Sequence, residues 1–182
     1  MKNLIKLFVI GLVMVRGLGA QSLNVEAGIA RVKNFHVQQM YGVSLFIKLN
    51  DRVSWNLAYR GWGGGDGEYE DNFNRHGFYS ADRYYDNFGT DFLLFYRVLR
   101  TGGFSMRLGS GFGRYEEKTI DISNVTHYFH RATFSHALLL LYDLNNRLSV
   151  CFRGTVSMEK FFDPPAWRLF NLGLVYHFSD RL

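Results

Sequence analysis

A two-residue alternation of apolar and polar side chains constrains this chain more than any other feature of its sequence. Between residues 40 and 49 every odd position is apolar, whereas the even positions include Gly42 and Ser44. A period of two is that of a β-strand, in which successive side chains point to opposite faces. Asn50 and Asp51 then give a tight-turn signal. The sequence predicts a strand, a turn and a second strand at this point.

The same alternation recurs in eight segments of about 9–12 residues each. Apolar positions alternate over residues 23–29, 41–49, 53–59, 92–98, 104–112, 132–142, 148–158 and 170–178. A tilted strand of this length can cross a bilayer, and eight is the smallest common number of strands in a membrane barrel. Short turns near residues 50, 102 and 145 alternate with longer links over 34–38, 61–89, 114–128 and 159–166. We therefore predict an all-β fold, an eight-stranded antiparallel up-and-down transmembrane β-barrel.

Residues 1–20 have the three-part pattern of a secretory signal peptide. Two lysines precede an apolar run over residues 7–15, and small residues follow up to Ala20. We expect cleavage after Ala20, which leaves a barrel domain over 21–182; an uncleaved N-terminal anchor is the alternative. Cleavage removes three of the 21 basic residues and no acidic residue, so the net charge falls from +5 to +2. The basic balance therefore gives no support to nucleic-acid binding.

The composition of the polar face indicates which side of the wall meets lipid. A soluble lipocalin-like barrel would turn the apolar face inward. Small residues would weaken a solvated strand but leave room for long side chains inside a narrow tube. Such residues on the polar face are Gly42, Ala58, Gly109, Gly111, Gly113 and Gly173. We predict a polar lumen and a lipid-facing apolar wall in the cell outer membrane, with a soluble periplasmic ligand-binding barrel as one alternative.

Arginines and aromatic residues support the same orientation. Arginine suits enclosed pairing with carboxylates, and the polar face carries Arg52, Arg60, Arg97, Arg107, Arg131 and Arg153. Aromatic girdles mark membrane interfaces, and the apolar face carries Tyr41, Tyr59, Tyr142, Tyr176 and Phe178 near strand ends.

The final strand, residues 170–178, resembles the closing strand of the small outer-membrane barrel proteins of the OmpA/OmpX type. The signal peptide and the eight-strand rhythm agree with this resemblance. It implies contact with outer-membrane lipids and lipopolysaccharide, and recognition of the closing strand by the barrel-assembly machinery. Here Ser179-Asp180-Arg181-Leu182 follows Phe178, so the closing aromatic residue is not terminal. The match is architectural, and no family-specific binding motif accompanies it.

The lumen arginines either line a pore or form a plug of salt bridges. A buried charge costs several kcal/mol unless it is paired, and eight strands leave an interior filled by side chains. We predict a plug and no open channel, with hydroxyls or water taking up the arginines that lack carboxylates. The expected partners are Glu26, Asp91, Glu159 and Glu117, and Cys151 is expected to be an inert buried thiol.

A lipid A-modifying acyltransferase or deacylase is the main alternative function, because six histidines offer general bases. They are His36, His76, His127, His130, His136 and His177. Such chemistry needs a nucleophile, a base and an orienting acid in mutual reach. Ser135 and His136 are adjacent in one strand and must point to opposite faces.

Two other combinations of these histidines are open. His177 and Ser179 match the His-x-Ser signature of such deacylases superficially, but they fall at the inner-leaflet end. His127 or His130 with Ser123 or Asp121 remains as a candidate. We predict no enzymatic activity and assign no catalytic, cofactor-binding or metal residue.

The link over 61–89 contains six acidic residues against Arg75 and Arg83. Clustered acids can bind calcium, but their spacing matches no EF-hand. We predict a solvated, tyrosine-rich surface loop, and tyrosines suit protein contacts. The sequence therefore favours a structural or surface-interaction role carried by long extracellular loops, with an extracellular protein partner as a hypothesis for the 61–89 loop.

Overall fold

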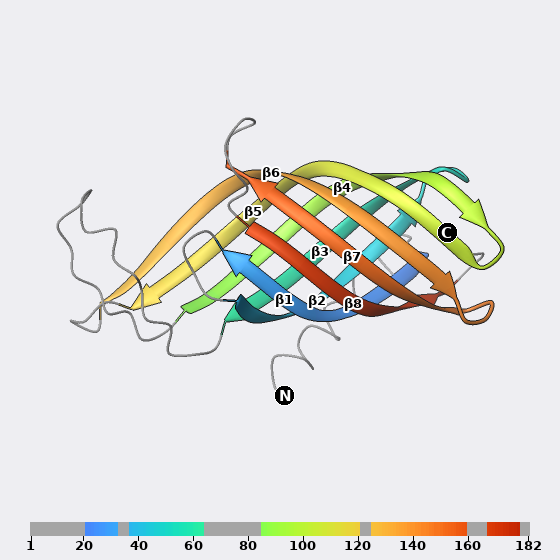
Figure 1. The fold of residues 1–182 in the computed structure, drawn as a ribbon. Helices are drawn as coiled ribbons and strands as arrows, with labels where there is room; N and C mark the ends of the chain where they lie inside the picture. Colours follow the sequence, from blue (N-terminus) through green and yellow to red (C-terminus); the bar gives the residue numbers. More distant parts are fainter. Residues whose placement is uncertain (1–20, 33–36, 64–84, 121–124, 160–166, 179–182) are drawn as a thin grey trace.

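The computed structural model describes residues 21–32, 37–63, 85–120, 125–159 and 167–178 of the chain. They form a closed antiparallel barrel in which each strand pairs with its neighbours in sequence and β8 pairs with β1 (Figure 1). The strands are β1 (Ser22–Val32), β2 (Val37–Lys48), β3 (Val53–Gly63), β4 (Tyr85–Thr101), β5 (Phe104–Ile120), β6 (Thr126–Asp143), β7 (Leu148–Met158) and β8 (Trp167–His177). The predicted eight-stranded up-and-down barrel is confirmed. No helix within these described ranges is long and apolar enough to cross a membrane.

The three predicted short turns lie at one end of the barrel, called the turn end here. Asn50 Oδ1 accepts hydrogen bonds from the backbone N–H groups of Arg52 and Val53, at 2.8 and 2.9 Å. Asn145 repeats this geometry with Arg147 and Leu148, so β2–β3 and β6–β7 are joined by the same Asx turn.

The third short turn depends on glycine. It joins β4 to β5, and Gly102 has a φ of 54°, a left-handed conformation that glycine adopts without steric cost. Beside the first turn, a hydrogen bond from Lys48, 2.9 Å away, lowers the pKa of the exposed Asp51 carboxyl.

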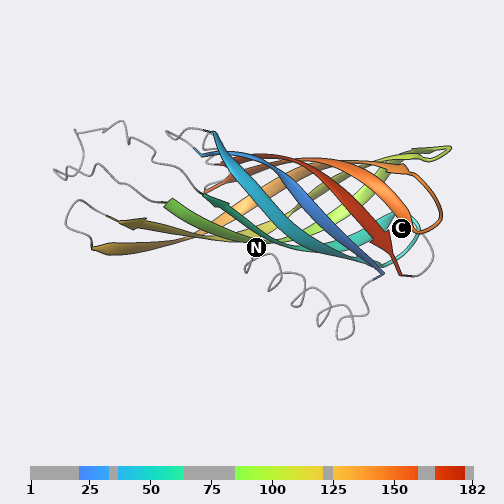
Figure 2. The same ribbon diagram turned by 90° about the horizontal axis from the view of Figure 1, so that it is seen from below.

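Three strands are longer than predicted. β4 and β5 have 17 residues and β6 has 18, against 11 or 12 in the other five. The predicted link over 114–128 is therefore wrong, because all of its described residues except Val125 continue β5 and β6, with Glu116 opposite His130. The alternation signal fades there since the strands leave the apolar layer. Figures 1 and 2 show β5 and β6 extending beyond the rest of the wall at the end opposite the turns.

The two faces of the wall follow the predicted parity. Phe92 and Leu94 are exposed on the outside of β4, whereas Asp91, Leu93 and Phe95 are buried in the lumen. Small residues occupy the lumen where large side chains need the space. A Cβ on Gly109 would lie 2.7 Å from the ring of Phe95, a separation at which something must shift.

Candidate functional site

Four charged side chains from four strands meet in the middle of the lumen and form the central ion cluster: Glu26 (β1), Arg60 (β3), Asp91 (β4) and Arg153 (β7). Each is at most 2% exposed. Arg60 Nε donates to Glu26 Oε1 at 2.6 Å, and Arg60 Nη1 donates to Asp91 Oδ2. Arg153 Nη1 lies 3.9 Å from Glu26 Oε2. Two cations therefore face two carboxylates, so the cluster is balanced in charge.

Hydroxyl groups complete the shell around Asp91. Tyr115 donates to Asp91 Oδ1 at 2.9 Å and Ser135 donates to the same oxygen at 3.1 Å. Ser157 Oγ lies 3.0 Å from the Tyr115 hydroxyl and 2.8 Å from that of Ser135. The buried carboxylate is thus held by an arginine and two hydroxyls, which is what an ionised group needs in this environment.

The positive charge of Arg153 is stabilised in a different way from that of Arg60. None of its three guanidinium nitrogens makes a hydrogen bond within the described chain, and its Cζ lies 5.4 Å from the centroid of the Phe95 ring. A guanidinium over an aromatic face is attracted by the ring quadrupole. The Phe95 ring therefore stabilises part of the positive charge of Arg153, for which the sequence analysis predicted hydroxyl groups or water as partners.

An apolar layer fills the lumen around Phe95, and consists of Phe46, Leu93, Phe95, Ala137, Leu139, Leu141, Cys151 and Val175. A second buried group comprises Ala30, Met40, Trp62, Tyr115 and Leu169. The predicted plug is present as these apolar side chains together with the central ion cluster. Cys151 is buried as predicted, and its thiol donates to Asn24 Oδ1 at 3.3 Å.

Near the turn end, Arg97, Arg100 and Arg107 form a second charged set, the turn-end arginines. Arg97 and Arg107 are directly opposite each other on β4 and β5. Arg107 is 2% exposed and donates from Nη1 to Ser54 Oγ at 3.1 Å. Its Nε and Nη2 atoms are buried and make no hydrogen bond to the described residues. In contrast to the central ion cluster, this set contains no carboxylate.

His177 links two serines on the same side of the lumen. Its Nδ1 lies 2.8 Å from Ser22 Oγ and its Nε2 lies 2.8 Å from Ser149 Oγ. Ser149 donates to Asp143 at 2.7 Å, so its proton is used there and Nε2 must be the donor to Ser149. His177 thus ties β8 to β1 and β7, and Ser179 of the His-x-Ser pattern lies outside the described residues.

Two of the six predicted lumen arginines are outside the closed lumen. Arg52 is exposed in the first turn, where Nη1 donates to the Tyr96 hydroxyl at 3.3 Å. Arg131 pairs with Glu159 on the rim, where both side chains are about two-fifths exposed. The predicted contact between Arg131 and Glu159 is confirmed, but the pair lies on the rim and does not help to fill the lumen. The side chain of Glu117 is outside the described part of the chain.

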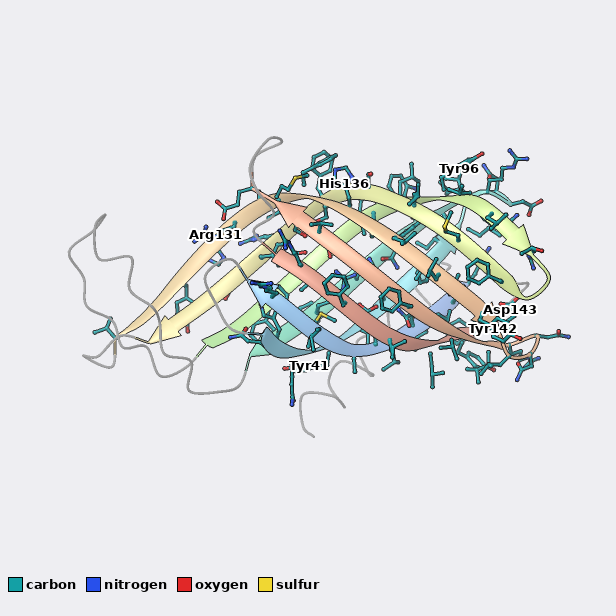
Figure 3. The ribbon with its side chains drawn as sticks, viewed as in Figure 1. Tyr41, Tyr96, Arg131, His136, Tyr142 and Asp143 are labelled. Carbon is teal, nitrogen blue, oxygen red and sulfur yellow. The ribbon has the colours of Figure 1, made fainter. Side chains whose placement is uncertain are left out.

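The structure also contains a serine–histidine pair that the sequence analysis missed. Ser110 on β5 and His136 on β6 are directly opposite each other on the outer face, and Ser110 Oγ lies 2.9 Å from His136 Nδ1. Phe134 packs edge-on against the imidazole, with the ring centroids 4.8 Å apart. Figure 3 shows His136 on the outside of the wall, farther from the turn end than Tyr96 and Tyr142. Ser135 points into the lumen, as predicted.

The other predicted combinations remain without support. His130 Nδ1 lies 3.4 Å from Glu116 on the projecting strands. Outside the described side chains lie His36, His76, His127, Asp121, Ser123 and the acids of residues 64–84. In the described ranges, no three His, Cys, Asp or Glu side chains gather closely enough to hold a metal ion.

The outer face carries a continuous apolar belt with aromatic residues towards its edges. Leu172 is 62% and Phe112 is 70% exposed, and many other exposed large apolar residues lie on the outward positions of the strands. Tyr142, Tyr176 and Phe178 lie near the turn end, and Tyr41 lies farther from it (Figure 3). A closed barrel with a charged, filled lumen and this belt requires lipid on its outside.

No protein-family model and no curated protein matches the chain. Solved structures do match. The N-terminal β-barrel domain of OprF from Pseudomonas aeruginosa is 18% identical, covering 87% of this chain and 98% of that one, with a TM-score of 0.59. Ail, the attachment invasion locus protein of Yersinia pestis, is 10% identical over 87% and 97%, with a TM-score of 0.56, and it has also been solved with the heparin analogue sucrose octasulfate.

The outer membrane enzyme PagL has the same fold, at 12% identity over 86% of this chain and 99% of that one and a TM-score of 0.53. At such low sequence identity, the similarity concerns the fold alone. Proteins with this one fold include a barrel domain, an attachment protein and an enzyme. The resemblance seen in the sequence is confirmed at the level of the fold. The chain therefore has the fold of the small eight-stranded outer-membrane β-barrels, with an apolar belt on its outer face.

Proposed function

We propose that this barrel serves as a rigid membrane platform that presents an extracellular binding surface. The surface is the projecting sheet, formed by residues 116–120 of β5 and 126–132 of β6 at the end of the barrel opposite the turns. In outer-membrane barrels the short turns face the periplasm and the longer connections face outward. The projecting sheet lies opposite the turns (Figure 2), so it extends away from the cell. Its projection is the observation that carries the proposal.

The side chains of the projecting sheet suit a macromolecular partner. Tyr128 is 57% exposed, and exposed tyrosine is enriched at protein interfaces. The Glu116–His130 and Arg131–Glu159 pairs place charged groups on or beside the projecting sheet, where a partner could contact them. The predicted 61–89 link is shorter than expected, because residues 61–63 belong to β3 and residues 85–89 to β4. A partner could also contact residues 64–84 between them, which are outside the described residues. The attachment role named for Ail is a precedent for this fold.

The two exposed tyrosines of β6 offer a matched test. Tyr128 and Tyr142 are 57% and 58% exposed at opposite ends of the same strand. Bacteria that express the barrel are assayed for adhesion to cultured epithelial cells and to immobilised heparin. We expect Tyr128→Ala to reduce adhesion severalfold and Tyr142→Ala to leave it unchanged. Equal effects of the two changes, or no adhesion above the empty vector, would count against the proposal.

A shortened hairpin tests the same surface without relying on one side chain. Residues 118–128 are replaced by Asn-Asp-Arg, the turn that already joins β2 to β3, which keeps Glu117 opposite Phe129. Heat-modifiable migration on a gel should show normal barrel assembly. Adhesion should be lost, because the outer part of the projecting sheet, with Tyr128, is removed.

The Ser110–His136 pair favours a second candidate function, the cleavage of a lipid ester. In that reaction Ser110 Oγ would attack the ester carbonyl carbon while its proton passes to His136. The ester C–O bond would break, the alcohol would leave with that proton, and water would hydrolyse the acyl-serine. The described residues supply no carboxylate to orient His136, which is why binding is our first proposal.

Mass spectra of lipid A and phospholipids distinguish the two candidates. Membranes with the wild-type protein are compared with membranes carrying Ser110→Ala, and Ser105→Ala serves as a control on the same strand that faces the lumen. A lipid product that disappears with Ser110→Ala alone would establish the enzyme. Identical spectra from all three would reject it.

A further inference from the structure

The turn-end arginines bring three positive charges together at one mouth of the lumen. Arg97 is directly opposite Arg107, and like charges directly opposite in adjacent strands destabilise a sheet. The pairing register shifts between Arg97 and Leu99, which sets the next arginine, Arg100, opposite the lumen residue Ser105. Three guanidinium groups therefore stand at neighbouring positions on β4 and β5.

The acidic groups of this end are already engaged. Asp51 lies 2.9 Å from Lys48, and Asp143 accepts a hydrogen bond from Ser149 at 2.7 Å. Within the described part of the chain, no ion pair joins a turn-end arginine to a carboxylate, although Asp143 is close enough to attract Arg107 electrostatically. Exposed Arg52 and Arg147 add further positive charge at the same end.

Burial makes this imbalance costly. Arg107 is 2% exposed, and Ser54 is its hydrogen-bond acceptor, which leaves Nε and Nη2 without one. A buried charge persists in a stable protein when a counter-charge or a hydrogen-bond partner compensates it. Unpaired guanidinium nitrogens also occur on Arg60 and Arg153. Those two arginines face the carboxylates of Glu26 and Asp91, whereas no carboxylate among the described residues forms an ion pair with Arg107.

We propose that the turn-end mouth binds an oxyanion, specifically a phosphate group held by Arg97 and Arg100, with the charge of Arg107 behind them. Guanidinium groups match phosphate geometry with two parallel hydrogen bonds and stay charged at every physiological pH. Because the turn end of such barrels faces the periplasm, the phosphate belongs to a phospholipid headgroup of the inner leaflet or to a soluble phosphate compound. This site is independent of the projecting sheet at the other end.

The test measures how phosphate stabilises the folded protein. The protein purified from outer membranes is kept in a maltoside detergent, which contains no phosphate, and its thermal midpoint is followed as inorganic phosphate replaces chloride at constant ionic strength. A ligand that binds the folded state alone raises the midpoint with its concentration. We expect a rise for the wild type, with at least tenfold weaker apparent affinity in Arg97→Met and in Arg107→Met.

A parallel arm identifies the source of the phosphate. The same variants are measured in nanodiscs of dimyristoyl phosphatidylglycerol or of an uncharged glycolipid. Stabilisation by inorganic phosphate indicates a soluble ligand, and stabilisation by phosphatidylglycerol alone indicates a headgroup; both support an oxyanion site. Arg52→Met is the control, since it removes an exposed turn-end charge outside the lumen and should keep the full response. No stabilisation in either arm, or an equal response in wild type, Arg97→Met and Arg107→Met, would overturn the proposal.

Discussion

The central ion cluster and the turn-end arginines both place arginine in the lumen, but the two sets differ in how the positive charge is balanced. Arg60 donates from two of its nitrogens to two carboxylates on other strands. Arg107 is equally buried, yet it has one serine and two neighbouring arginines. Burial and residue type therefore do not define the role of an arginine here. The difference lies in whether the fold itself supplies the counter-charge. It does so for Arg60, and we propose that a bound oxyanion does so for the turn-end arginines.

The largest effect is expected from Arg60→Met. This change leaves Glu26 and Asp91 as buried carboxylates without their arginine, and breaking a buried ion pair costs about 3–5 kcal/mol. The free energy of unfolding is measured by urea titration of the detergent-folded barrel. Adding Glu26→Gln and Asp91→Asn to Arg60→Met should recover a large part of the loss. If the single and triple variants were equally unstable, the cluster would owe its effect to packing and not to charge.

The next effect concerns Phe95, whose ring lies beside Arg153 and in the apolar layer that fills the lumen. Phe95→Ala should cost about 3–4 kcal/mol because it removes a buried ring and leaves a cavity. Phe92→Ala is the matched control on the same strand, since Phe92 is 46% exposed on the outer face where lipid can fill the space. A similar loss for both would contradict the assignment of the two faces.

The smallest effect is expected from Arg107→Met in phosphate-free conditions. The change breaks no ion pair among the described residues and removes a buried charge whose hydrogen-bond acceptor is Ser54, so the free energy of unfolding should stay unchanged or increase. The same urea titration gives the comparison with Arg60→Met. A loss of the size expected for Arg60→Met would mean that Arg107 has a structural partner after all, and the contrast between the two arginine sets would disappear.

The faces of the strands could be predicted from the sequence because parity is a local property. The ends of the strands could not, since Arg114 and Glu116 follow Phe112 at the outward positions of β5 and interrupt the apolar signal. The same reason explains Arg52 and Arg131. Both have the parity of lumen residues, but one lies in a turn and the other on the rim, and height along the barrel cannot be read from alternation.

Side-chain contacts between strands were harder to predict from the sequence than the faces of the strands. The Ser110–His136 pair depends on the register of β5 against β6, and the two residues are 26 positions apart. The central ion cluster joins four strands. The sequence could identify its members as lumen residues, but it could not predict which arginine contacts which carboxylate. A signal for Ser110 did exist, because it is a polar residue at an outward position between Leu108 and Phe112.

The central claim is that the apolar face of the wall contacts lipid while the polar face encloses a filled lumen. Two tryptophans of β3 test it directly, since Trp55 stacks with Phe92 on the outer face and Trp62 is 2% exposed in the lumen. Each is kept in turn as the one tryptophan of the protein, the others being replaced by phenylalanine, in bilayers with phospholipids brominated at several depths. The account predicts strong quenching of Trp55 fluorescence and little quenching of Trp62 at every depth. Quenching of Trp62 with Trp55 shielded would contradict it.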